Sequence, residues 1–226
     1  MVVRESIRRV AATAAPVAVA IALAVMPPAA RAGAQAEEQL APSVATLLSR
    51  AISDQPAPAD YVDRPALRAW LDQMSPRLAS RIADTRSRED FLATVHYEAT
   101  RAGLDPQLVL GVIQHESAFR KYAVSIVGAR GYMQVMPFLT KLIGSPEQNL
   151  FHLRTNLRYG CVILRHYLDI ENGDVYRALG RYNGSLGQAE YPTAIMTALN
   201  RNWVYTPASP PGNRIGAVTL VPTSTR

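Results

Sequence analysis

Apolar residues at helical spacing constrain the fold of this 226-residue chain more than any other feature. Between positions 64 and 183 they recur every three or four residues, and no segment alternates between apolar and polar positions as a half-buried strand would. In the run from Leu67 to Met74 the pattern is clear. Pro76 then interrupts it, and Leu78 with Ile82 favours a second short helix. The sequence therefore predicts a mainly α-helical domain.

Several helix starts are marked further along the chain. Ser87, with Asp90 three positions later, resembles a capping box ahead of an apolar stripe. Asp105-Pro106 combines an N-cap acid with proline at the first helical position, so a helix is expected to begin here. Two more helices are expected over about 155–170 and 174–182.

The first 36 residues have the pattern of a secretory signal peptide. Arginines precede an apolar run from Val10 to Met26, and small-residue cleavage patterns follow at 30–32 and 34–36. The alternative is an uncleaved membrane anchor, but this run is short beside the roughly 20 apolar residues of a span. No cysteine lies near the cleavage patterns, which disfavours lipid modification. We expect residues 1–36 to be removed, no membrane span to remain, and the mature protein to be periplasmic or secreted.

Two segments flank the predicted domain. Residues 37–63 contain much Ala, Pro, Gln and Ser with little periodicity, which indicates a linker. Residues 206–226 are rich in proline and are expected to form a flexible tail. The helical pattern thus runs from about 64 to 205.

Charge and composition exclude several classes of protein. The 24 basic and 18 acidic residues give a net charge of +6, and residues 1–36 hold half of it, so the remainder is too mildly basic to predict nucleic-acid binding. A single cysteine, Cys161, allows neither a disulfide framework nor a multi-cysteine metal site. Its place on an apolar helix face favours a small core residue over a nucleophile. Since no histidines show metal-ligand spacing, we expect no metal and no cofactor.

Glu116 stands at an unexpected position. In the helix that begins at Pro106, the apolar residues include Val109, Val112 and Ile113, and Glu116 follows them by seven, four and three positions. That spacing places its carboxyl on the apolar stripe near the helix end. Loss of water and the negative end of the helix dipole should both raise its pKa. A carboxyl protonated near neutral pH can act as a general acid.

Other interpretations of this region remain open. The helix could emerge into solvent at Glu116, or the carboxyl could pair with Arg120 or Lys121. A zinc-binding H-E-x-x-H helix is excluded, because the second histidine position is Phe119. Ser117 lacks the glycines of a G-x-S-x-G nucleophile elbow.

Four ordered segments resemble the family 1 lytic transglycosylases, the goose-lysozyme-like enzymes of the bacterial cell wall. Residues 112–119 (VIQHESAF) look like the Glu-Ser motif, and residues 128–137 (GARGYMQVMP) are similar to G-x-x-G-L-M-Q-[IVL]-x-P. Residues 149–164 resemble the N-[LI]-x-x-G-x-x-[YI]-L helix, and Tyr182-Asn183 resembles the Tyr-Asn of A-Y-N-x-G. Together these segments lie within residues 87–191, about half of the chain.

The resemblance implies a lysozyme-like helical domain over 87–205 with a substrate cleft. The helical spacing of the preceding segment predicts a helical extension at 64–86. It gives Glu116 the role of sole catalytic acid and base in cleaving the bond between N-acetylmuramic acid and N-acetylglucosamine. The muramic C6 hydroxyl would then close onto C1 and leave a 1,6-anhydromuramic end. The implied partner is the glycan strand of peptidoglycan. Glu98, Glu147 and Glu190 lie outside the four motifs and are expected to be surface acids.

The resemblance also implies substrate-binding residues: Ser117, Met133, Gln134, Tyr182 and Asn183. Met133, Ser117 and Asn183 each have a structural alternative. Met133 could be core filling, Ser117 could end its helix, and Asn183 could hold a loop, while the Tyr182 hydroxyl could orient the acid. The sequence departs from the family at Tyr132, Arg181 and Ser185, which replace the usual Leu, Ala and Gly.

Three functions are compatible with these residues. The leading one is a lytic transglycosylase, and a hydrolytic muramidase on the same fold is its enzymatic alternative. A non-catalytic wall-binding scaffold, which could serve a cell-envelope assembly whose partner the sequence does not identify, is the third.

Overall fold

The computed structural model describes residues 40–207, and within them the regular structure is helical. The elements are α1 (Pro42–Ala51), η1 (Tyr61–Asp63), α2 (Pro65–Leu78), α3 (Thr85–Arg101), α4 (Pro106–Ser117), α5 (Phe138–Ile143), α6 (Leu153–Ile170), α7 (Val175–Asn183), α8 (Glu190–Ala198) and η2 (Leu199–Trp203). Extended pairing in this range is limited to isolated bridges at Val124–Arg130 and Arg130–Val135. The predicted mainly α fold is confirmed. The predicted signal peptide and most of the predicted tail lie outside the described residues.

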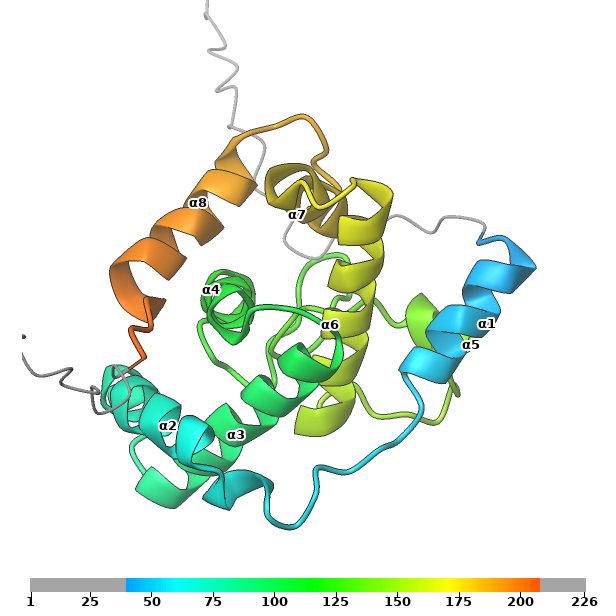
Figure 1. Ribbon diagram of the computed structural model, residues 1–226. Helices are drawn as coiled ribbons and strands as arrows, with labels where there is room; N and C mark the ends of the chain where they lie inside the picture. The colour runs from blue at the N-terminus through cyan, green and yellow to red at the C-terminus, as the bar shows by residue number, and fades with distance from the viewer. Residues whose placement is uncertain (1–39, 208–226) are drawn as a thin grey trace, which may run out of the picture.

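Helix α4 forms the centre of the domain. Figure 1 shows it surrounded by α2, α3, α6, α7 and α8, and α3 and α8 pack directly against it. Val109, Leu110, Val112 and Ile113 have no solvent exposure, so apolar side chains on several sides of this helix are covered. A helix that is apolar on most sides is stable only in such a buried position.

Acidic N-caps begin several of the helices. Asp105 accepts a hydrogen bond from the Gln107 backbone N–H at 2.8 Å, as expected. The expected capping box at Ser87 is wrong: α3 begins at Thr85, and its N-cap is Asp84, which accepts from the Ser87 N–H at 2.7 Å. Because the Asp84 carboxylate satisfies this backbone N–H, the helix starts earlier than the Ser87–Asp90 pattern predicts.

The expected break at Pro76 is also wrong. Pro76 lies within α2, which continues to Leu78 as one helix. Trp70, Met74 and Leu78 on the same helix are almost completely buried. This packing offsets the hydrogen bond that a proline removes from the last turn.

The predicted linker over 37–63 contains a packed helix, α1, so this part of the interpretation needs correction. Leu48 and Ile52 are buried, and α1 lies against α5 and α6 (Figure 1). The Arg101 guanidinium donates to the carbonyl oxygens of Ala51 at 2.7 Å and Ser53 at 2.9 Å, which fixes the end of the helix. The predicted boundaries at 64–86 and 87–205 stay predictions.

None of the helices within residues 40–207 combines the length and apolar composition needed to cross a membrane.

Candidate active site

The end of α4 carries Glu116 into the interior. The side chain lies in the last helical turn with 6% exposure, between apolar neighbours that are fully buried. The alternative in which the helix emerges into solvent is therefore wrong. Arg120 does not pair with this carboxyl; its Nε donates to the Ser117 carbonyl oxygen at 3.0 Å. The Lys121 ammonium lies 5.2 Å from the centre of the Tyr122 ring.

The backbone reverses sharply after α4. Ala118 and Phe119 both adopt left-handed conformations, with φ of 49° and 64°. A bulky residue rarely takes this conformation, so the surrounding packing must hold it. The Phe119 ring is 6.0 Å from the Phe91 ring and 5.5 Å from the Trp203 ring. Such strain concentrates at functional sites, and here it directly follows the buried carboxyl.

A tyrosine hydroxyl holds the Glu116 carboxyl. The Tyr191 hydroxyl donates to Glu116 Oε1, while Oε2 is buried and has no hydrogen-bond partner among residues 40–207. Burial raises the pKa of Glu116 from 4.5 to about 7, although the Tyr191 hydrogen bond opposes this rise. Near neutral pH the carboxyl is therefore divided between its acid and its base forms.

Tyr191 is the site residue that sequence reasoning missed. It lies in the first turn of α8 and is 4% exposed. The His115 ring stands perpendicular to it, with 5.0 Å between ring centres. Burial and the neighbouring Glu116 raise the pKa of Tyr191, so it remains a hydrogen-bond donor. The sequence favours Tyr182 for this role, but the Tyr182 hydroxyl donates to the Met133 carbonyl oxygen at 2.7 Å.

The loop that contains Gln134 is rigidly built. Gln134 is 2% exposed and has a φ of 48°, and its amide nitrogen donates to the carbonyl oxygens of Gly131 at 2.9 Å and Ala123 at 3.2 Å. Gly131 has a φ of 75°, and a Cβ there would lie 2.4 Å from the amide nitrogen of Asn156. This glycine is therefore required for both its conformation and its close packing.

Asn156 ties this loop to α6. Its Oδ1 accepts from the Met133 backbone N–H, and its Nδ2 donates to the carbonyl oxygens of Arg130 and Leu150, each at 2.8 Å. The sequence indicates Asn156 only as part of a motif. Its amide satisfies two backbone groups of the loop and one of the segment before α6, and so fixes the path of residues 130–135.

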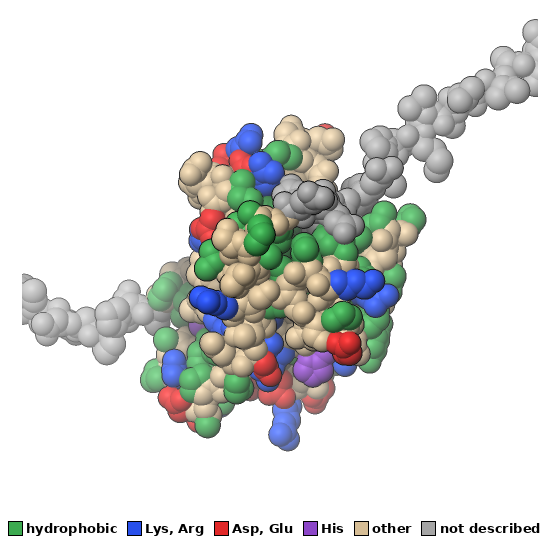
Figure 2. All heavy atoms as spheres, turned by 90° about the vertical axis from the view of Figure 1, so that its right-hand side faces the viewer, with side chains coloured by type: hydrophobic (Ala, Val, Ile, Leu, Met, Phe, Trp, Pro, Cys, Tyr) green, Lys and Arg blue, Asp and Glu red, His purple; other side chains and the backbone are tan. Residues whose placement is uncertain are grey.

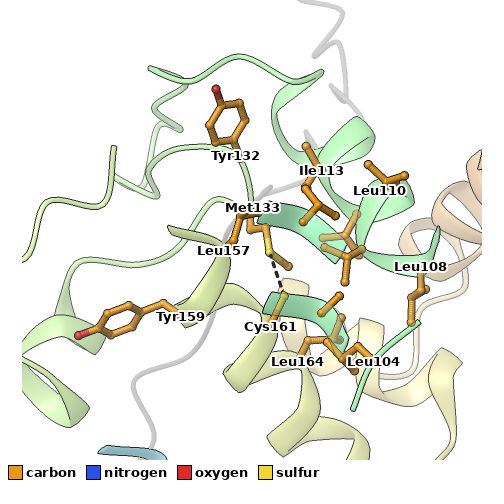
Figure 3. Close-up of a cluster of buried hydrophobic side chains, with 14 of the residues drawn as sticks. Leu104, Leu108, Leu110, Ile113, Tyr132, Met133, Leu157, Tyr159, Cys161 and Leu164 are labelled. Carbon is orange, nitrogen blue, oxygen red and sulfur yellow. Dashed lines mark hydrogen bonds between the residues drawn. The ribbon is translucent and has the colours of Figure 1, made fainter. Parts of the chain in front are cut away.

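Met133 points into the core. Figure 3 shows its side chain directed at Cys161 of α6, with the two sulfur atoms 4.0 Å apart. Met133 has no solvent exposure, and a Cβ at Gly160 would lie 2.4 Å from its sulfur. The core-filling interpretation thus describes its position, and its predicted substrate contact stays a prediction. Cys161 is a buried, free thiol, as expected.

Two other predicted substrate-binding residues have local partners. The Ser117 hydroxyl donates to the Ile113 carbonyl oxygen at 3.1 Å within its own helix. Asn183 donates from Nδ2 to the Ser185 hydroxyl at 3.0 Å, whereas its Oδ1 is buried without a hydrogen-bond partner in the described part of the chain. The unsatisfied amide oxygen of Asn183 leaves an acceptor available for a ligand.

Two of the departures from the family, Arg181 and Tyr132, have structural explanations. Arg181 forms an ion pair with Glu171, which also pairs with Arg177, so these charges belong to a separate surface network. Tyr132 is 9% exposed and lies 5.0 Å from the Phe91 ring, where it packs in the core.

Glu98 is a second buried carboxyl, and the expectation that it is a surface acid is wrong. It is 2% exposed and pairs with Arg101 at 3.4 Å and Arg158 at 3.6 Å. Burial raises the pKa of Glu98, and the arginines oppose that rise. Glu98 lines a cavity of about 700 Å³ beside α1, whereas Glu116 does not. Glu147 and Glu190 are exposed, as expected.

Another cavity, of about 670 Å³, lies between α2, α4 and η2, and Glu116 lines neither of the two. Within residues 40–207 no three His, Cys, Asp or Glu side chains are grouped as metal ligands would be.

A mainly helical domain whose central helix ends with a buried carboxyl held by a tyrosine defines a candidate acid–base site. Comparison with known proteins agrees with this class. Residues 93–199 match the family described as Transglycosylase SLT domain. The chain therefore carries a domain of the lytic transglycosylase family.

Curated relatives share the same region. A protein named Transglycosylase from Enterobacteria phage PRD1 is 37% identical over 114 residues, which covers 47% of this chain and 42% of that protein. Membrane-bound lytic murein transglycosylase C of Haemophilus ducreyi is 32% identical over 120 residues, covering 46% of this chain and 32% of the relative. The protein of the same name from Actinobacillus pleuropneumoniae is 46% identical over 54 residues, or 24% and 14% of the two chains. The chain thus spans less than half the length of these relatives.

Proposed function

We propose that this protein is a peptidoglycan lytic transglycosylase. It cleaves the β-1,4 bond between N-acetylmuramic acid and N-acetylglucosamine and leaves 1,6-anhydromuramic ends. The observation that carries the proposal is the state of Glu116, whose buried carboxyl has a pKa of about 7 and a hydrogen bond from Tyr191. The family domain and the names of the relatives support the same activity.

The reaction proceeds in two steps on one carboxyl. Protonated Glu116 first donates its proton to the glycosidic oxygen, and the bond from that oxygen to muramic C1 breaks. The resulting carboxylate then takes the proton of the muramic C6 hydroxyl as its oxygen bonds to C1. Glu116 ends as it began and no water is consumed. A pKa near neutrality suits both steps, because each form is well populated.

One carboxyl is sufficient because the substrate supplies its own nucleophile. Glycosidases in general use a pair of carboxyls, the second as nucleophile or as base for water. A hydroxyl on the reacting sugar replaces that group, and its fixed distance from C1 supplies the advantage of proximity. Tyr191 keeps the Glu116 carboxyl oriented during both proton transfers. Ser117, Met133, Gln134, Tyr182 and Asn183 complete the proposed substrate site.

The proposed partner is the glycan strand of peptidoglycan, and the proposed location is the periplasm or the extracellular space. The pattern of residues 1–36 supports export. The relatives from Haemophilus and Actinobacillus are named as membrane-bound murein enzymes, which agrees with a place in the cell envelope.

Glu116→Gln tests the proposal. In turbidity clearing of purified sacculi, this variant should lose at least about a hundredfold in rate, the usual scale for general acid–base catalysis. Glu147→Gln is the matched control, since Glu147 is exposed and outside the site, and it should clear like the parent chain. If Glu116→Gln clears as fast as the parent chain, Glu116 is not the catalytic acid. If the parent chain binds sacculi without clearing them, a wall-binding scaffold replaces the enzyme.

A further inference from the structure

The cavity between α2, α4 and η2 has an unusual charge. Its volume is about 670 Å³, and the charged side chains that line it are Arg77, Arg81 and Arg201. No carboxylate among residues 40–207 lines it. The face of the molecule in Figure 2, by contrast, mixes side chains of both charges over its surface. A concave site lined by one sign of charge concentrates ligands of the opposite sign.

The C-terminal turn η2 builds one wall of the cavity. It is a π-helical turn that follows directly on α8, and it supplies Arg201, Asn202 and Trp203 to the lining. The Trp203 ring N–H donates to Gln114 Oε1 at 2.8 Å, and the Asn202 amide donates to the same oxygen at 3.1 Å. These bonds attach the turn to α4. Short π-helical turns are rare and occur frequently at functional sites.

The arginines differ in how they are held. Arg77 donates to the carbonyl oxygens of Asn202 at 3.2 Å and Val204 at 2.6 Å, so it stabilises the wall. Arg81 and Arg201 are exposed, and within residues 40–207 their guanidinium groups make no hydrogen bond or ion pair. A guanidinium presents a planar set of donors that matches a carboxylate. Two such groups at one cavity are therefore available to an anionic ligand.

The cavity and the candidate acid share one helix. Gln114 lines the cavity, and Glu116 follows it by two residues on α4. Two residues correspond to a rotation of about 200° and a rise of about 3 Å, so the cavity lies across the helix from the carboxyl. A helix with its side chains is about 10–12 Å wide, so a peptide of a few residues that branches from a bound glycan strand, at up to about 3.5 Å per residue, is long enough to span this distance.

We propose that this cavity binds the free carboxylates of the peptide stems that branch from the glycan strand. The inference rests on the proposed function and extends it: the protein favours peptide-bearing peptidoglycan over bare glycan. Arg81 and Arg201 contact the carboxylates, and Gln114 with Asn202 offers amide contacts to the peptide backbone.

Binding of a soluble stem peptide tests the site without cleavage. Isothermal titration of the full chain would compare a synthetic stem peptide, the same peptide with its carboxylates amidated, and inorganic phosphate. The free peptide should bind, amidation should abolish binding, and the double variant Arg81→Ala/Arg201→Ala should weaken it about tenfold. The control Arg86→Ala/Lys141→Ala removes two exposed charges outside the cavity and should alter affinity less than about twofold.

Equal affinity of the free and amidated peptides would overturn the assignment, as would binding of phosphate but not of peptide. A thermal melt of each variant separates lost binding from lost folding.

The second measurement is the ratio of cleavage rates on intact sacculi and on glycan stripped of its peptides. Arg81→Ala/Arg201→Ala should lower this ratio severalfold, and an unchanged ratio would contradict the inference. If the parent chain cleaves neither material, the proposed function is wrong. The titration with the stem peptide still tests whether the cavity binds carboxylates.

Discussion

Glu116→Gln should make the fold more stable above neutral pH, in addition to abolishing activity. Burial raises the pKa of Glu116 from 4.5 to about 7. Between these values the folded protein binds a proton that the unfolded chain releases, so its free energy of unfolding falls as the pH rises from about 4.5 through 7. Glutamine has nearly the same shape and cannot ionise, and it can still accept the Tyr191 hydrogen bond. The free energy of unfolding of the variant therefore does not fall over this pH range.

The size of this stabilisation follows from the pKa shift of Glu116. The difference 7 − 4.5 is about 2.5 pH units, which corresponds to about 3 kcal/mol at roughly 1.4 kcal/mol per unit. For a domain of this size that is an increase in Tm of about 6–12 °C at high pH. Thermal unfolding followed by circular dichroism, at about pH 4 and about pH 8.5, measures both ends of the range.

The gain should be present at about pH 8.5 and absent at about pH 4, where both folded and unfolded chains carry a protonated carboxyl. Glu147→Gln is the control: a hydrogen bond from Ser145 lowers the pKa of this exposed carboxyl, so its variant should show no gain at high pH. A difference between Glu116→Gln and the parent chain that is the same at both pH values would refute the raised pKa.

Other substitutions test the supporting contacts. Tyr191→Phe removes the hydrogen bond that favours ionised Glu116, so the alkaline limb of the kcat/KM profile should move up by roughly 1 pH unit; an unmoved limb argues against this contact. Gly160→Ala places a Cβ 2.4 Å from the Met133 sulfur and should cost about 1–3 kcal/mol in urea unfolding. Glu98→Ala removes one of the two carboxylates paired with buried Arg158, whose pair with Asp54 remains, and should cost about 1–3 kcal/mol, while the clearing rate per folded molecule changes little.

The central helix could be predicted from the sequence because its determinants are local. Asp105 and Pro106 mark its start, and the spacing of Val112, Ile113 and Glu116 places the carboxyl on the buried side. Helical periodicity and capping depend on residues only a few positions apart, so they can be read without the tertiary structure. The raised pKa of Glu116 followed from that placement.

The contacts that complete the site depend on residues far apart in the sequence. Tyr191 reaches Glu116 across 75 positions, and nothing in its own segment marks it as a partner. Helix α1 is fixed by Arg101 and Arg158, which approach Ile52 and its neighbours from α3 and α6. Side chains that stabilise a segment from elsewhere in the fold leave no periodic pattern in the segment itself.

The products of digestion test the central claim most directly. Purified sacculi would be digested with the parent chain, and the released muropeptides analysed by mass spectrometry. The proposed mechanism predicts fragments that end in 1,6-anhydromuramic acid, each lighter by one water than a reducing end. Reducing muramic ends throughout would show that water is the nucleophile, and would contradict cleavage by Glu116 with the C6 hydroxyl.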